Sequence, residues 1–375
     1  MTIDRLKQGI INRTVRFINK RRGWKTDRKI VVIESDDWGS IRMPDRETYE
    51  RSLKKGIRVD KCSFCKNDTL ASNDDFEALY TVLRQYKDAS NNHPVITANT
   101  IVGNPDFDKI KKSGYKEYHF ELFTETLKRY PNRSFDLWKQ GMDEGLFYPQ
   151  LHGREHLNIG RWLKLLQNGS KEMHFAFENK FFGISSTISN ENNPSLMAAL
   201  DYDNNYGKQL ALDSVEQAPG IFEDIFGFKS KSFIGPNYVW DEYVEKTLAT
   251  KDVQFFQGSF VNKTASQGNR YHYIGKVNKY GQIYTARNVI FEPAGQLNNS
   301  LVGIAIKQID NAFNLKKPAI ISSHRVNFIG SVFEDNRTKN LELLDELLKE
   351  ILKRWPNVEF IHSAQLGELI KQDII

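Results

Sequence analysis

Asp36 and Asp37 are adjacent carboxylates at the end of an apolar run, which reads Lys-Ile-Val-Val-Ile-Glu-Ser-Asp-Asp-Trp over residues 29–38. Such a run predicts a strand buried on both faces, and polar groups at the carboxyl end of a parallel strand face the ligand crevice of α/β folds. On extended backbone the two side chains point in different directions, so one can bind a metal ion while its neighbour handles a proton. A helix N-cap or a solvated turn would use the same pair without any chemistry.

Two of the eight histidines favour the chemical interpretation. His152 and His156 lie four residues apart in Leu-His-Gly-Arg-Glu-His, at an expected strand–helix junction, where both imidazoles can face one metal ion. With Asp37 they would supply two nitrogens and one oxygen and leave a position for water, which suits a divalent metal ion with zinc as the first choice. His324 ends another apolar run and can serve as a proton donor.

The rest of the chain alternates between strand-like and helix-like segments. Strands are expected at residues 29–38, 93–100, 145–152, 231–236, 252–259, 288–292, 318–324 and 358–362. Helices are expected after a cap at 72–75 and at 120–142, 154–167, 241–250 and 337–354, and residues 170–228 are expected to be a largely helical insertion that forms a lid or substrate wall. This alternation predicts an α/β fold, a (β/α) barrel of seven or eight mainly parallel strands, in one domain over residues 29–375.

The order of these motifs resembles the NodB-type polysaccharide deacetylases, carbohydrate esterase family 4, over residues 29–370. The resemblance implies a distorted barrel of the TIM type and the metal-dependent hydrolysis of an N- or O-acyl group, most simply acetyl, from a carbohydrate or glycolipid. Carried over residue by residue, it makes Asp36 the catalytic base and His324 the catalytic acid. It makes Asp37, His152 and His156 the metal ligands.

Two motifs depart from the family pattern. The first motif normally reads Thr-Phe-Asp-Asp-Gly, whereas here Trp38 replaces the glycine. The third motif normally carries an arginine before its proline, which holds the base, whereas here Ile234 stands at that place. A charge from elsewhere could hold the base, and the sequence offers three candidates, namely Arg42, Arg154 and Arg325.

The substrate contacts are predicted near the metal and the third motif. The resemblance places an oxyanion donor on the backbone N–H after the third-motif proline, here near Asn237 or Tyr238. Trp38, Tyr238 and Trp240 could stack on sugar faces, although each could equally belong to the core.

Two other functions compete with deacetylation. His-Gly-Arg-Glu-His also matches the His-x-x-Glu-His signature of inverzincin peptidases, in which Glu155 would be the general base, but that requires the motif to lie inside a helix. Pro149 and Gly153 favour a strand end instead. The third possibility is a barrel that binds glycan or a partner with a degenerate site, which the departures at Trp38 and Ile234 motivate.

The net charge of +6 is concentrated at the start of the chain. Residues 1–29 hold ten Lys and Arg against Asp4 and Asp27, a net charge of +8, so the remainder sums to −2. The basic balance therefore does not indicate a protein that binds nucleic acid. Residues 1–28 are expected to be a basic, partly helical segment that packs on its own domain or makes weak contact with an anionic membrane surface.

Composition limits the remaining possibilities. A hydrophobic content of 39% supports a sizeable core, and no apolar run approaches the ~20 residues that a membrane span needs. The start of the chain lacks a signal-peptide pattern, which predicts a cytoplasmic protein. Cys62 and Cys65 have Cys-x-x-Cys spacing without a second pair, which argues against a structural zinc site and leaves incidental loop residues, redox chemistry and a disulfide open.

Overall fold

The computed structural model describes residues 14–265, 268–295 and 300–374. The strands of its main sheet are β1 (Lys29–Trp38), β2 (Ile96–Ile101), β5 (Phe147–Gly153), β6 (Ser232–Phe233), β7 (Phe255–Phe256), β10 (Lys276–Val277), β11 (Ile283–Tyr284), β12 (Val289–Ile290), β13 (Ala319–His324) and β14 (Val358–Phe360). Their order is β10–β11–β7–β6–β5–β2–β1–β13–β12, with β14 paired to β1. Among these described strands every pair is parallel except β10 with β11.

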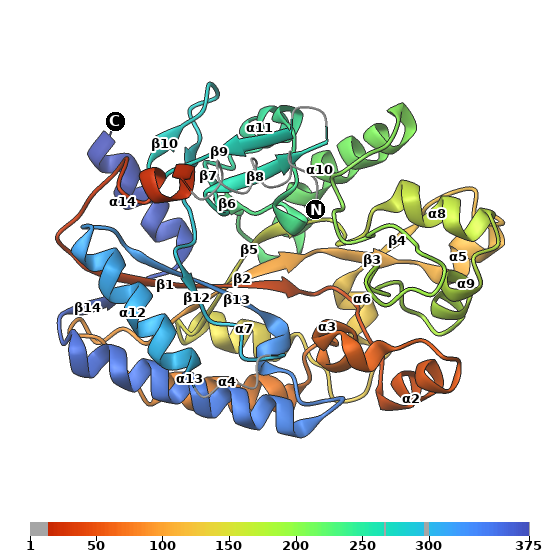
Figure 1. Ribbon diagram of the computed structural model, residues 1–375, viewed down its shortest axis with the longest axis horizontal. Coiled ribbons are helices and arrows are strands. Elements are labelled where there is room, and N and C mark those ends of the chain that lie inside the picture. The colour runs from red at the N-terminus through yellow and green to blue at the C-terminus, as the bar shows by residue number, and fades with distance from the viewer. Residues whose placement is uncertain (1–13, 266–267, 296–299, 375) are drawn as a thin grey trace.

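Helices cover both sides of this sheet. They are α2 (Arg46–Lys54), α3 (Ser63–Asn67), α4 (Asn73–Arg84), α5 (Phe107–Lys112), α6 (Phe123–Leu127), α7 (Asp136–Asp143), α8 (Ile159–Gln167), α9 (Lys171–Glu178), α10 (Asn205–Phe226), α11 (Glu242–Ala249), α12 (Leu301–Asn314), α13 (Glu334–Arg354) and α14 (Ser363–Ile374). Short 3₁₀ turns lie at Val59–Lys61, Pro236–Tyr238 and Arg325–Phe328, and two small hairpins pair β3 (Gly103–Pro105) with β4 (Phe120–Leu122) and β8 (Val261–Thr264) with β9 (Gly268–Tyr271). Figure 1 shows α4, α7, α12 and α13 on one side of the sheet and α10, α11 and α14 on the other.

The sheet curls because a short segment joins its two edges. Residues 285–288 connect β11 near one edge to β12 at the other, and an extended chain spans only about 3.5 Å per residue. In this segment the Arg287 N–H donates to the Gly258 carbonyl at 2.8 Å, and the Asn288 N–H donates to the Ile320 carbonyl at 3.1 Å. The prediction of an α/β fold with mainly parallel strands in a barrel-like arrangement is therefore confirmed. Residues 285–288 join the two edges of the curled sheet.

Most predicted elements lie where the sequence pattern places them, with two corrections. The helix predicted over residues 120–142 is wrong: β4, α6 and α7 replace it, and Asn132 between them has a left-handed backbone with φ of 57°. The helix predicted over 154–167 begins only at Ile159, capped by the Asn158 side chain, because residues 154–158 form a loop. The insertion at 170–228 contains α9 and α10, and the segment between them lines the cavity described below.

The core lies on both faces of β1. Ile30, Val31 and Val32 are each 0% exposed. Val31 faces one hydrophobic cluster, while Ile30 and Val32 face another. Since successive side chains of a strand point to opposite faces, the continuous apolar run reflects burial on both.

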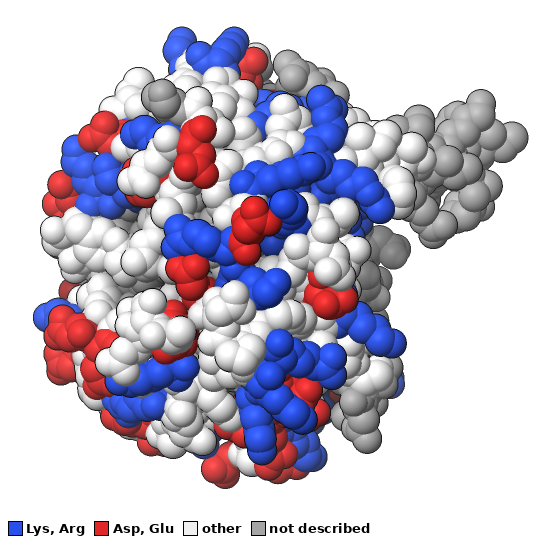
Figure 2. Space-filling model, turned by 90° about the vertical axis from the view of Figure 1, so that its left-hand side faces the viewer, with Lys and Arg blue, Asp and Glu red and all other residues white. Residues whose placement is uncertain are grey.

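The leading basic segment is described only from residue 14, and residues 1–13 lie outside the described residues. Residues 14–19 are helical, the Asn19 side chain donates to the His272 carbonyl at 2.9 Å, and the Trp24 indole donates to Asp373 in α14 at 2.8 Å. Figure 2 shows the face of the molecule that lies on the left in Figure 1. Lys and Arg side chains are numerous on this face, with Asp and Glu among them. Contact with a membrane surface and the boundary at residue 28 stay predictions. No described helix is long and apolar enough to cross a membrane.

Two glycines provide a test of the packing between α14 and the sheet. A Cβ added at Gly367 would lie 2.4 Å from the Phe255 ring, whereas one added at Gly220 in α10 would meet nothing within 4 Å. Gly367→Ala should therefore destabilise the protein by about 1–3 kcal/mol through overpacking. Gly220→Ala should stabilise it by up to ~1 kcal/mol, because glycine is a poor helix former. Urea unfolding measures both, and an unchanged midpoint for Gly367→Ala would contradict this packing.

Candidate metal centre and active site

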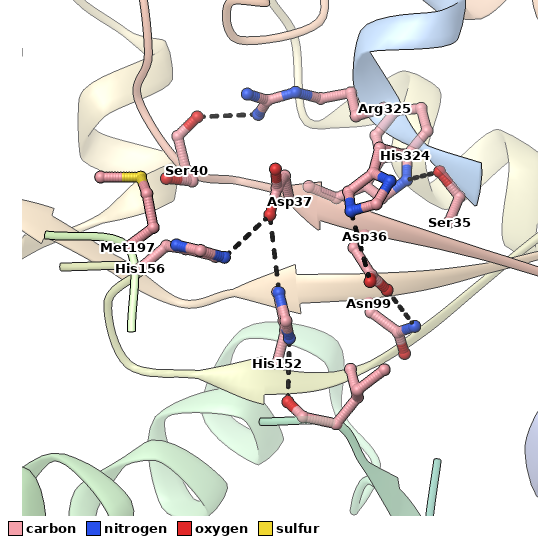
Figure 3. A network of polar contacts seen from close by, with 12 residues as sticks. Ser35, Asp36, Asp37, Ser40, Asn99, His152, His156, Met197, His324 and Arg325 are labelled. Carbon is pink, nitrogen blue, oxygen red and sulfur yellow. Dashed lines mark hydrogen bonds and ion pairs between the residues drawn. The ribbon is translucent and has the colours of Figure 1, made fainter. Parts of the chain in front are cut away.

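The carboxyl ends of β1, β5 and β13 meet at one cavity of about 540 Å³. Asp36 is in register with His324 on the neighbouring β13. The cavity is lined by the predicted side chains Asp36, Asp37, His152, His156, Asn237, Tyr238 and His324. Figure 3 shows Asp37 facing the two histidines and Asp36 facing His324 and Asn99. The structure thus brings together residues predicted from sequence segments that lie far apart.

Asp37, His152 and His156 form a compact, buried group of candidate metal ligands. One ligand atom from each lies within 4.8 Å of the others. The Asp37 Oδ1 atom is 3.1 Å from His156 Nε2 and 3.5 Å from His152 Nε2. Oδ1 of Asp37 and Nε2 of His152 are buried without a hydrogen-bond partner. Since buried polar atoms are nearly always satisfied, these residues fit a divalent cation.

The backbone of β1 separates the two carboxylates. Asp37 has a left-handed φ of 73°, and the register with β2 shifts between Ser35 and Trp38. The prediction of an extended backbone at this pair is therefore wrong at Asp37. A bulge changes the direction of side chains at the end of a strand. Asp36 and Asp37 still point in different directions, as predicted, but the bulge is the cause.

Neighbouring groups prepare the candidate ligands. The His152 Nδ1 atom lies 2.8 Å from the Ile234 carbonyl oxygen, which leaves Nε2 free toward Asp37. Burial lowers the pKa of His156 to about 3, so its imidazole is neutral and can coordinate a metal. The Arg42 guanidinium donates to the second oxygen of Asp37 at 3.0 Å. Burial would raise the pKa of Asp37, but the ion pair with Arg42 helps to hold that pKa well below its usual range.

Arg287 holds the second carboxylate. Its guanidinium donates to both oxygens of Asp36, at 2.6 and 2.7 Å, and to Glu34 at 2.6 Å. The Asn99 side chain adds a donor to Asp36 at 2.7 Å. Burial would raise the pKa of Asp36, but Arg287 lowers it below the usual range, so Asp36 stays ionised.

None of the three arginines proposed from the sequence holds Asp36. Arg42 pairs with Asp37, Arg154 pairs with its neighbour Glu155, and Arg325 donates to Asp68 at 2.9 and 3.0 Å. The residue that sequence reasoning missed is Arg287, which follows β11 in the segment that closes the sheet. Its only signal was a basic residue just before an expected strand.

Glu292 is the second residue that the sequence analysis missed. It follows β12 and accepts from His324 Nδ1 at 2.5 Å, and the Asn327 side chain holds its other oxygen at 2.8 Å. Burial opposes protonation of His324, but Glu292 raises the pKa of His324 to about 9. Its signal was an acidic residue at the end of the expected strand 288–292.

The structure corrects the expected sugar stacking by Trp38 and Trp240. Both side chains are 1% exposed and neither lines the cavity. Trp38 packs against Phe147 and Trp138, with ring centroids 4.7 and 6.0 Å away, and its indole donates to Ser35. It is a core residue.

Asn237 and Tyr238 do line the cavity, on an unusual turn. Both have a left-handed φ of 56°. The Tyr238 N–H donates to the Gly235 carbonyl at 2.9 Å and is therefore occupied. Of the two predicted oxyanion donors, the Asn237 N–H therefore stays the candidate. The Tyr238 hydroxyl accepts from Arg287 at 3.0 Å.

The geometry disagrees with the inverzincin alternative. His152 lies at the end of β5, and the residues that follow it form a loop and no helix. Glu155 is 2% exposed and paired with Arg154 at 2.5 Å. It is absent from the lining of the cavity, so it does not occupy the place of a general base.

Comparisons with known proteins reveal similarity only at the level of structure. No protein-family model matches the chain, and no curated protein matches it. A Mycobacterium smegmatis protein provisionally assigned as a polysaccharide deacetylase is 10% identical with a TM-score of 0.45, over 94% of this chain and 93% of that one. The Puue allantoinase is 8% identical with a TM-score of 0.44, over 93% and 92%. A 4-alpha-glucanotransferase from Thermococcus litoralis is 8% identical with a TM-score of 0.44, over 90% of this chain and 40% of that one. The function therefore has to be argued from the side chains of the site.

Removing the charge of Arg287 should expose its role. Arg287→Gln leaves Glu34 and Asp36 buried without a cation, which should cost about 3–5 kcal/mol of unfolding free energy at pH 7. Because Arg287 lowers the pKa of Asp36, that stabilisation is present above the unfolded pKa of ~4 and is lost as the pH falls below it. The gap between variant and wild type should therefore narrow from pH 7 to pH 3.

The matched control is Arg84→Gln, which breaks an ion pair with Glu144 in which both side chains are 35% exposed. Its loss should cost at most ~1 kcal/mol. Denaturant unfolding at several pH values measures both variants. Equal costs for the two would contradict the importance of burial at Arg287.

Proposed function

We propose that this chain is a divalent-metal-dependent hydrolase that removes an N- or O-acyl group, most simply acetyl, from a sugar, a polysaccharide precursor or a glycolipid. The observation that carries the proposal is that the polar side chains around one cavity form two groups, one suited to bind a metal ion and one suited to transfer protons. Asp37, His152 and His156 place three candidate ligand atoms close together in a buried position, and atoms of these residues lack a hydrogen-bond partner there. Beside them, Arg287 holds the Asp36 carboxylate and Glu292 holds the His324 ring.

Asp37, His152 and His156 would hold the metal. Two imidazoles and one carboxylate with room for a further ligand are the donor set of catalytic zinc sites, so zinc is the first choice. A divalent cation bound there supplies Lewis-acid polarisation of an acyl carbonyl and makes water a better nucleophile at neutral pH.

Asp36 is positioned to act as the general base. Its carboxylate stays ionised because Arg287 lowers its pKa, and it lines the cavity beside the ligand Asp37. It would accept the proton that the attacking water releases. The Arg287 and Asn99 donors fix the orientation of both oxygens, which general-base catalysis requires.

His324 is positioned to act as the general acid. With its pKa raised to about 9, the imidazole carries a proton at neutral pH. Its Nε2 lies 3.8 Å from Asp36, so acid and base flank the same space. Donation from Nε2 to the amine nitrogen would let the C–N bond break, because an unprotonated amine anion is a poor leaving group.

The remaining wall of the cavity suits a polar substrate. The N–H of Asn237, which lines the cavity, would donate to the oxygen that becomes negative when water adds to the carbonyl. The hydroxyls of Ser185, Ser186 and Ser195, from the segment between α9 and α10, line the same space. Hydroxyl groups of this kind can exchange hydrogen bonds with a sugar.

A barrel that binds glycan without catalysis is the second candidate. The departures at Trp38 and Ile234 motivated it, yet Trp38 lies in the core, and Arg287 supplies the charge that Ile234 lacks. The ionised Asp36 and protonated His324 favour hydrolysis, since binding alone needs neither.

Two substitutions at adjacent positions should separate metal binding from proton transfer. Asp37→Ala should lose the bound metal, because it removes one of three ligands. Asp36→Asn should keep the metal and lose hydrolysis, because an amide cannot accept the proton. Metal content by elemental analysis and hydrolysis of N-acetyl- and O-acetyl-sugars measure both. Loss of metal from Asp36→Asn would mean that the two roles are assigned wrongly, and metal-loaded wild type without hydrolysis of any acyl sugar would favour the binding barrel.

The acid role of His324 predicts a change in rate and in pH profile. His324→Ala should lower kcat by roughly 10²–10⁴-fold with metal retained. Glu292→Gln should lower the pKa of His324, because Glu292 contributes most to raising it, so the alkaline limb of kcat should move to lower pH. A loss below tenfold for His324→Ala, or an unshifted limb for Glu292→Gln, would show that another group protonates the amine.

A further inference from the structure

Cys62 and Cys65 lie in the wall of the same cavity, and no step proposed above uses them. Both thiols are free, Cys65 is buried and Cys62 is partly exposed. Cys62 lies between a 3₁₀ turn that ends at Lys61 and the short helix α3, and Cys65 lies within α3. Solvent reaches Cys62 more readily than Cys65.

The backbone already suits a bond between the two sulfurs. Ser63 and Phe64, which separate the cysteines, belong to α3, and helical geometry sets Cα atoms three residues apart at about 5 Å. Disulfides span Cα separations of about 4.4–6.8 Å. The two side chains also lie close enough for Cys65 to affect the pKa of Cys62. Rotation of the side chains is therefore enough to bring the sulfurs to bonding distance.

The two thiols differ in the way that exchange chemistry requires. The neighbouring Cys65 thiol, the nearby backbone N–H groups of Cys65 and Phe64 and the charge of Arg42 outweigh burial and lower the pKa of Cys62 to about 6. The pKa of Cys65 is raised by its interaction with Cys62 and by burial. Cys62 is thus the accessible thiolate, and Cys65 is the protected partner.

The pair also touches groups of the active site. The Phe64 ring, between the two cysteines, lies edge-on to the His324 ring with centroids 5.2 Å apart. The Arg42 guanidinium lies 6.0 Å from the centre of the Phe64 ring and pairs with Asp37. The Cys65 thiol donates to the carbonyl of Gly183 at 3.2 Å, and Gly183 lines the same cavity. A bond between the two sulfurs would therefore form beside groups that contact His324 and Asp37.

We infer that Cys62 and Cys65 form a redox-active dithiol, which a low-molecular-weight disulfide of the glutathione type oxidises to an intramolecular disulfide in the wall of the cavity. This property goes beyond the proposed hydrolysis and does not depend on it.

The chemistry is thiol–disulfide exchange in two steps. The Cys62 thiolate attacks one sulfur of the small disulfide, forms a mixed disulfide and releases one small thiolate. Cys65 then loses its proton and attacks the Cys62 sulfur, so that the Cys62–Cys65 bond forms and the second small thiolate leaves. The protein loses two electrons and two protons, and the small disulfide gains them as two thiols.

The full chain with its bound metal should be incubated in mixtures of reduced and oxidised glutathione, quenched with acid, alkylated and weighed by intact mass spectrometry. As the oxidised fraction rises, the number of alkylated thiols should fall from two to zero, and the protein should lose two hydrogens. Excess reduced glutathione should restore both thiols. Two alkylated thiols at every ratio, or a mixed disulfide that persists in the wild type, would overturn the inference.

Single substitutions assign the two roles. Cys65→Ser should accumulate one glutathione adduct at Cys62, because the resolving thiol is missing. Cys62→Ser should stay unmodified, because Cys65 is buried. Ser63→Ala retains both thiols and should form the disulfide as the wild type does. Equal adduct formation by Cys62→Ser and Cys65→Ser would overturn the assignment of Cys62 as the attacking thiol.

Discussion

Burying carboxylates at the end of β1 is the constraint on which the site depends. Glu34 and Asp36 are 0% and 4% exposed, and a buried charge without a partner costs several kcal/mol. Arg287 offsets this cost by donating to both carboxylates. Arg287 lies in the segment that joins the sheet edges, and its N–H donates to the Gly258 carbonyl. The segment that joins the edges therefore also carries the guanidinium that holds the proposed base.

A second buried network serves the neighbouring carboxylate. Asp37 pairs with Arg42, Arg42 lies 3.6 Å from Asp68, and Arg325 completes the chain by binding Asp68 and the Ser40 carbonyl. Figure 3 shows the contact of Arg325 with Ser40. Adjacent carboxylates in one low-dielectric site would repel each other and share their titration if they had a common partner. Separate arginines allow Asp36 and Asp37 to stay ionised together, which the proposed division between base and ligand requires.

The local sequence pattern predicted the strands and the polar residues at their ends, but it did not predict Arg287 and Glu292, which bind those residues. The apolar runs of β1 and β13 are long and end in polar groups, so their strands and the residues Asp36, Asp37 and His324 could be placed from sequence. Arg287 and Glu292 flank β12, a strand of two residues whose length gives no periodic signal. The contact between Arg287 and Asp36 joins positions 251 residues apart, and only the closure of the sheet creates it. Charge partners of this kind follow from topology, so the sequence offered three arginines and missed the one that binds.

Trp38 illustrates how a departure from a family pattern can leave the chemistry in place. Glycine is the usual residue after such a pair because it tolerates an unusual backbone. Here the left-handed conformation falls on Asp37, and the Trp38 ring packs into the core against Phe147. A large buried side chain, whose indole also donates to Ser35, therefore anchors the chain directly after Asp37. Core packing of Trp38 therefore shapes the turn in place of a flexible glycine. The candidate ligand oxygen of Asp37 still faces His152 and His156.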